Sequence, residues 1–176
     1  MYHKKYLKYK FKYNTLKNTK KCNNLAMYSD VSDNIVYIGE FMVTDKVITG
    51  ESWNLILDMP KGLYKAYKSN NDLIIVHKSN KNKINKDYLL NKIFNVVGEV
   101  GVDTGIFGFY DSVISVKKNN VIGGPDIPFF EMPIDVEYRM VSVNNKIVGV
   151  QMRTGCGDGF FKCLGNDGIG VLLGCG

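Results

Sequence analysis

The residues best suited to chemistry lie in the segment VGEVGVDTGIFGFYD, which spans residues 97–111. Within it, Asp103-Thr104-Gly105 follows an apolar run, as the catalytic carboxylate of an aspartic protease does. Such an enzyme needs two carboxylates that share one proton. This chain has one Asp-Thr-Gly, so a second chain would have to supply the partner, and Ile106 stands where that active site needs a small residue. The segment therefore favours an acidic turn between two strands, and a hydrolase that uses Asp103 is the alternative.

A second candidate is the glycine-rich segment TGCGDGFFKCLGNDG, residues 154–168. A calcium loop needs six or more oxygen ligands, and here only Asp158, Asn166 and Asp167 could contribute. A phosphate-binding loop ends in Gly-Lys-Ser/Thr, which is missing. We therefore interpret the glycines as tight turns on either side of the strand FFKCL, and predict neither a metal site nor a cofactor. Asp158 stays a candidate catalytic residue.

The cysteines offer a third kind of chemistry. Cys156 lies between glycines and could be an exposed nucleophile, but it would need a histidine base, and His77 is the only histidine after residue 3. No Cys-x-x-Cys pair is present, which disfavours zinc. In an oxidising setting a disulfide could form among Cys156, Cys163 and Cys175, and free thiols are the alternative.

Residues 1–24 form a basic leader with eight lysines and no acidic residue. Their apolar side chains recur at helical spacing, at Tyr2, Tyr6, Tyr9, Tyr13 and Leu16. A helix of this composition needs a surface to lie on, and a nucleic acid or another polyanion would suit its charge. The residues that we assign to this binding are Lys4, Lys5, Lys8, Lys10, Lys12 and Lys17. The rest of the chain has 15 basic and 17 acidic side chains, so its net charge does not favour a polyanion.

The chain after the leader must position these candidates, and its sequence has the pattern of short strands. Alternating or apolar runs of strand length are separated by turn sequences such as SNND, VNNK and GNDG. Only residues 85–94 have a helical pattern, and SWNLILDM (52–59) is ambiguous. We predict a mainly β fold, an antiparallel β-sandwich or barrel-like meander with one or two short helices. The predicted organisation is a helical leader at 1–24, a linker at 25–33 and a single β-rich domain at 34–176.

Composition limits the classes of protein further. The 176 residues are 45% hydrophobic and 23% charged, which is typical of a globular domain. No apolar run approaches the roughly 20 residues that span a bilayer, and no secretory signal is recognisable, so a cytosolic or particle-enclosed protein is expected. Two alanines and two arginines stand against 21 lysines and 18 asparagines, a bias typical of an A/T-rich genome.

Two resemblances follow from these motifs. The leader segment KYLKYKFKYNTLK resembles a Tyr/Lys-rich segment that opens many proteins of mimivirus-like giant DNA viruses. The body resembles the domain-of-unknown-function family numbered four-two-four-one, through FMVTDKVI, MPKGLYKAY, VGEVGVDTGIFGFYD and TGCGDGFFKCLGNDGIGVLL. One departure is Lys46, where that family often has proline. The resemblance implies a β-rich fold and transfers no catalytic residue.

We therefore predict a non-enzymatic structural or interaction protein that is packaged in, or associated with, a giant-virus particle, or lies in the host cytoplasm. Its partner would be a viral or host protein. One alternative is a nucleic-acid-associated protein that binds through its leader. The other is a hydrolase, which would require the convergence of several carboxylates, for which the candidates are Asp103, Asp111, Asp126 and Asp158.

Overall fold

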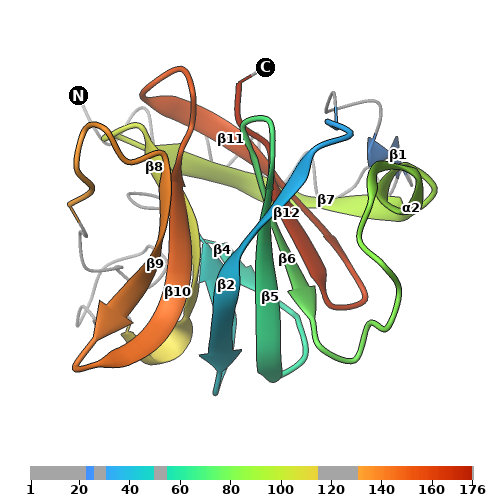
Figure 1. Ribbon diagram of the computed structural model, residues 1–176, viewed down its shortest axis with the longest axis horizontal. Helices are drawn as coiled ribbons and strands as arrows, with labels where there is room; N and C mark the ends of the chain where they lie inside the picture. The colour runs from blue at the N-terminus through green and yellow to red at the C-terminus, as the bar shows by residue number, and fades with distance from the viewer. Residues whose placement is uncertain (1–22, 26–30, 50–54, 115–130, 176) are drawn as a thin grey trace, which may run out of the picture.

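The computed structural model describes residues 23–25, 31–49, 55–114 and 131–175. These residues fold into two antiparallel sheets, which confirms the predicted mainly β class (Figure 1). The basic leader lies outside the described residues, except for its last two. Within the described part, no helix has the length and apolar character needed to cross a membrane.

The larger sheet has seven strands. In spatial order they are β1 (Asn23–Asn24), β7 (Ile93–Val102), β11 (Gly159–Asn166), β12 (Ile169–Leu172), β6 (Asp72–His77), β5 (Gly62–Ser69) and β2 (Ile35–Val43). Strand β12 thus lies inside the sheet, between β11 and β6. The two halves of the sheet, β1-β7-β11 and β6-β5-β2, meet on this four-residue strand.

The smaller sheet has five strands. In spatial order they are β4 (Leu55–Leu57), β3 (Val47–Thr49), β8 (Ile106–Asp111), β10 (Lys146–Arg153) and β9 (Tyr138–Val143). The described helical elements are the short α2 (Lys86–Leu90) and the 3-10 helix η2 (Ser112–Ile114). In Figure 1, β9 and β10 lie at one end of the molecule, and α2 lies beside β1 at the other.

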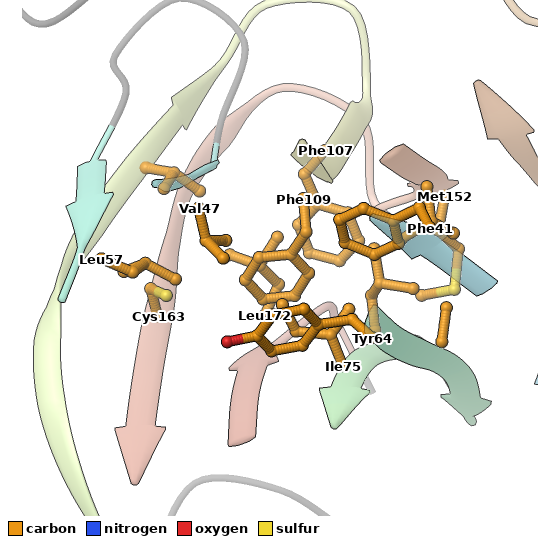
Figure 2. Close-up of a cluster of buried hydrophobic side chains, with 14 of the residues drawn as sticks. Phe41, Val47, Leu57, Tyr64, Ile75, Phe107, Phe109, Met152, Cys163 and Leu172 are labelled. Atoms are coloured by element: carbon orange, nitrogen blue, oxygen red, sulfur yellow. The ribbon is translucent and has the colours of Figure 1, made fainter. Parts of the chain in front are cut away.

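The main core lies between the two sheets. Alternate side chains of one strand point to opposite faces, so Phe107 and Phe109 of β8 face this core, whereas Tyr110 belongs to a separate cluster on the outer face. Figure 2 shows Phe109 beside Tyr64, with Phe41 close by. The Tyr64 and Phe41 rings stack at 6.0 Å, and the Phe107 and Phe161 rings meet edge to face at 5.5 Å.

A second core covers the other face of the larger sheet. Leu89 from α2 and Leu25 and Val31 from the N-terminal region pack against Ile74 and Val171 of the sheet. Leu25 and Leu89 have no solvent-exposed surface, and Val31 is only 2% exposed. The sequence predicts a linker over 25–33, but the structure places both of its described apolar residues in this core.

The turns agree with the sequence. Asn70, Asn144, Asn145 and Asp167 have positive φ angles, and they belong to the segments SNND, VNNK and GNDG. Asn and Asp tolerate this conformation better than other residues with a side chain, so the hairpins can be tight.

One predicted boundary differs from the structure, and one segment that the sequence left open is resolved. The helical pattern over 85–94 covers only α2, because the helix ends at Leu90 and β7 begins at Ile93. Asn85 caps the start of α2, because its side chain accepts a hydrogen bond from the Tyr88 N–H at 2.8 Å. At the other end, the Asn91 N–H donates to the carbonyls of Asp87 and Leu89 in the last turn. The ambiguous segment 52–59 contributes the strand β4.

Candidate functional site

A glycine-rich corner joins the two sheets. The chain passes from β7 to β8 through residues 103–105, and from β10 to β11 through residues 154–158. These two crossings run side by side, because Val102 pairs with Gly159 in one sheet and Ile106 pairs with Arg153 in the other. The two glycine-bearing motifs that the sequence singles out, far apart along the chain, therefore meet at one place.

At this corner the backbones of the two crossings contact each other directly, with no side chain between them. A Cβ added at Gly105 would lie 3.1 Å from the Gly157 Cα. The Thr154 N–H donates to the Gly105 carbonyl at 2.9 Å, and the Thr154 hydroxyl donates to the Gly157 carbonyl at 2.7 Å. Gly105, Gly155 and Gly157 all have positive φ, a conformation that favours glycine. The prediction of tight turns in this segment is thus confirmed.

The segment after β12 completes the corner. A disulfide joins Cys156 to Cys175, whose N–H donates to the Thr154 carbonyl at 2.9 Å. The Asn71 side-chain amide donates to the Cys175 carbonyl, and the buried Asp72 carboxylate accepts the Gly174 N–H at 3.1 Å. Of the pairings that the sequence left open, the structure selects this one and leaves Cys163 as a free thiol.

The three candidate catalytic residues all lie at the corner, but they differ in chemistry. Asp103 and Asp158 are exposed residues that flank the paired Val102 and Gly159 on the side of the crossings. The sulfur of Cys156 is in the disulfide, so it cannot act as a thiolate while the bond is intact. The described residues contain no group of three His, Cys, Asp or Glu side chains that could hold a metal ion.

The other aspartates do not join this pair. Asp111 lies at the far end of β8 from the Asp103 turn, because the two are separated by the whole strand Ile106–Asp111. Asp126 lies outside the described residues. The structure therefore places two of the four aspartates that a hydrolase was expected to need at one corner, and a third elsewhere.

Asp111 organises a different polar site, which sequence reasoning missed. Its side chain is 1% exposed, and its carboxylate accepts the Thr44 N–H at 3.0 Å, the Thr44 hydroxyl at 2.5 Å and the Asp45 N–H at 3.3 Å. These bonds fix the turn between β2 and β3 to the end of β8. A polar residue that closes the apolar run IFGFYD was the signal available in the sequence.

Asp45 extends this site to the surface. The Ser112 hydroxyl donates to its carboxylate at 2.9 Å, and the Lys61 ammonium lies 3.6 Å away. The hydrogen bond from Ser112, followed by the positive charges of Lys61 and Lys46, holds the pKa of Asp45 below its ordinary value. This arrangement supports a turn and has the features of a structural site.

The contacts of His77 and Cys163 also indicate structural roles. The His77 ring nitrogens lie 2.7 Å from the Ser79 hydroxyl and 3.0 Å from the Lys61 carbonyl, and the ring meets Tyr64 edge to face. Cys163 is completely buried in the main core, and this burial raises the pKa of its thiol. A buried thiol with a raised pKa is inert, so Cys163 is not a candidate nucleophile.

No family model, curated protein or solved structure matches this chain. The resemblances drawn from its motifs therefore remain predictions. The lysines assigned to nucleic-acid binding, Lys4, Lys5, Lys8, Lys10, Lys12 and Lys17, lie outside the described residues.

Proposed function

We propose that this chain is a non-enzymatic structural or interaction protein of a virus particle. The supporting observation is the Cys156–Cys175 disulfide at the sheet corner. Disulfides persist in oxidising settings, which include the surfaces of virions and of cells, and are rare among cytosolic proteins. The bond also uses the sulfur of a candidate nucleophile for a structural purpose.

The polar groups of the corner support the same proposal. The Thr154 hydroxyl and the Asp72 carboxylate are hydrogen-bonded to backbone groups of the corner itself. Groups that satisfy buried backbone in this way stabilise a loop, and their hydrogen-bonding capacity is used by the fold. A rigid, disulfide-linked corner suits a protein that must survive outside a cell.

The first test is the location and redox state of the protein. Quantitative mass spectrometry should find the chain enriched in purified particles relative to infected-cell lysate, and alkylation before reduction should leave Cys156 and Cys175 unlabelled. A protein that stays in the lysate, or that carries both thiols reduced in purified particles, would contradict the proposal.

The second test addresses the hydrolase alternative. Purified full-length protein is assayed for peptidase activity at acid and neutral pH, beside Asp103→Asn and Asp158→Asn, which remove the two candidate carboxylates in turn. We expect no cleavage by any of the three. Cleavage by the wild type that disappears in a stably folded Asp103→Asn protein would replace our proposal with an aspartic-protease function.

The alternative of nucleic-acid binding rests on a separate observation, the eight lysines and no acids of residues 1–24. Binding through lysines displaces condensed counterions from the phosphates, so it should be independent of sequence and should weaken steeply with salt. A variant with glutamine at the six assigned lysines should lose this binding and keep its melting temperature. Binding that is retained in this variant, or that is insensitive to salt, would contradict the role of the leader.

A further inference from the structure

The disulfide at the corner lies at the end of the strand that joins the two halves of the larger sheet. Strand β12 pairs with β11 through Cys163–Asn166 on one side and with β6 through Leu73–Val76 on the other. Each pairing involves only four residues. Since a strand this short has few ladder bonds, its attachment depends on the burial of its four side chains and on what holds its ends.

The C-terminal end of β12 has three kinds of attachment. One is a pair of side-chain hydrogen bonds, since the Asn71 amide donates to the Cys175 carbonyl and the Asp72 carboxylate accepts the Gly174 N–H. Backbone bonds also hold this end, since the Leu173 N–H donates to the Lys162 carbonyl at 3.0 Å and the Cys175 N–H donates to the Thr154 carbonyl at 2.9 Å. The Cys156–Cys175 disulfide is the covalent attachment. The hydrogen bonds place the Cys175 sulfur beside Cys156, and the disulfide prevents the segment from leaving when those bonds open.

The two cysteines differ in exposure. Cys156 is exposed and lies between Gly155 and Gly157, whereas Cys175 is half-buried. A side chain added at Gly157 would find no atom within 4 Å, so the approach to this part of the loop is open. A thiolate from solution can therefore reach the sulfur of Cys156 more easily than that of Cys175, while Cys163 is shielded by the core.

We propose that the Cys156–Cys175 disulfide is a redox lock on β12, and that it is opened and closed by thiol–disulfide exchange at Cys156. The co-reactant is a dithiol reductant, or in reverse a disulfide oxidant. This inference concerns the folded chain itself, so it does not depend on the proposed location in a virus particle.

The exchange proceeds in two steps. A thiolate of the dithiol attacks the Cys156 sulfur, a mixed disulfide forms, and Cys175 leaves as a thiolate that takes up a proton. The second thiolate of the reductant then attacks the reductant's first sulfur in the mixed disulfide, and Cys156 leaves as a thiolate that takes up a proton. The reductant ends as a disulfide, the protein gains two thiols, and two electrons have moved to the protein.

Opening the lock should change the stability of β12 more than that of the other core strands. The disulfide closes a loop between residues 19 positions apart, and loss of a link across a loop of about that size removes roughly 3 kcal/mol of constraint, equivalent to about 100-fold in local opening. We therefore expect amide exchange in β12 and the facing residues of β6 to accelerate by about 100-fold on reduction, with β8 and β10 changing much less.

The test is hydrogen–deuterium exchange with mass spectrometry on the full chain, oxidised and reduced. A Cys156→Ser/Cys175→Ser double variant should exchange like the reduced protein and should not respond to reductant. If the double variant does not fold, the reduced wild type still provides the comparison. Equal exchange of β12 in the oxidised and reduced proteins would overturn the lock.

A second measurement tests the role of Cys156. Each single variant, Cys156→Ser and Cys175→Ser, is treated with oxidised glutathione, and peptide mapping assigns the adducts. We expect Cys156 in the Cys175→Ser protein to react at least tenfold faster than Cys175 in the Cys156→Ser protein. The opposite order, or equal rates, would show that exchange does not begin at Cys156.

Discussion

Gly105 and Gly157 lie back to back at the junction of the two sheets, so close that a Cβ on Gly105 would be 3.1 Å from the Gly157 Cα. A side chain on Gly105 would require the crossing at 154–158 to move away by a few tenths of an ångström. The separation of the two sheets at this corner is therefore set by direct backbone contact.

This contact predicts different effects for two similar substitutions. Both glycines have positive φ, at +68° for Gly105 and +84° for Gly157, so alanine should cost about 1 kcal/mol at either position. Gly105→Ala should cost about 1 kcal/mol more, because its methyl group meets backbone, whereas Gly157→Ala meets nothing within 4 Å. Urea denaturation of the two variants provides the measurement. Equal losses would show that the backbone contact does not determine the spacing.

The buried carboxylate of Asp111 predicts a large loss of stability on substitution. Asp111→Asn keeps one oxygen but replaces the other with an amide donor, which then faces the N–H group of either Thr44, bound by Oδ2, or Asp45, bound by Oδ1. We expect a cost of about 2–3 kcal/mol in the free energy of unfolding, since bonds to a buried charged acceptor are lost. Asp103→Asn, at an exposed turn, should cost about 1 kcal/mol or less. Similar melting temperatures for the two variants would contradict the anchoring role of Asp111.

The interaction between Ser112 and Asp45 predicts a pH dependence. The pKa of Asp45 is lowered from its ordinary 3.8, first by the Ser112 hydroxyl, so ionised Asp45 stabilises the fold above about pH 4. That contribution is lost as the pH falls through the lowered pKa of the folded state. In Ser112→Ala the pKa should rise toward its ordinary value, and the acid unfolding midpoint should move to higher pH. An NMR titration of the Asp45 carboxyl carbon checks the shift, and an unchanged value would rule out the hydroxyl as its main cause.

The burial of Leu25 predicts that the domain includes residues from the expected linker. Leu25→Ala should lower the free energy of unfolding by about 2–4 kcal/mol, because it leaves a cavity in the second core. The matched control is Ile134→Ala, since Ile134 is 94% exposed and its truncation should change stability by less than about 0.5 kcal/mol. Thermal and urea melts would show the difference. A Leu25→Ala protein as stable as the control would show that residue 25 belongs to the linker and not to the folded domain.

The strands that could be predicted from the sequence are those with a visible pattern. The run KIVGVQMR forms β10 over Lys146–Arg153, because an apolar run between an Asn-Asn turn and a Thr-Gly turn has clear ends. The strand β3 was missed and the segment of β4 stayed ambiguous, because three residues are too few to show alternation. Their place in the smaller sheet depends on pairing with β8, which is remote in sequence.

The candidate site was predictable in its residue types but not in its assembly. Glycines at 105, 155 and 157 indicated turns from their own sequence, since each needs only a local conformation. That the two turns touch follows from the register of β7 with β11 and of β8 with β10, which no local pattern encodes. The choice of Cys175 as the partner of Cys156 depends on the same register, because it is the position of β12 that brings residue 175 to the corner.

The interior position of β12 also has a consequence for synthesis on the ribosome. Asp72 and Gly174 are 102 residues apart in the sequence. Most of these residues must be synthesised after β6 before its neighbour β12 exists. At about 5–20 residues per second, the nascent chain carries β6 for several seconds before its neighbour is made. During that time the unpaired edge of β6, an apolar strand of the sequence DLIIVH, can pair with another chain. Chaperone binding to the nascent chain while residues 78–168 are made would therefore protect this edge and raise the yield of folded protein.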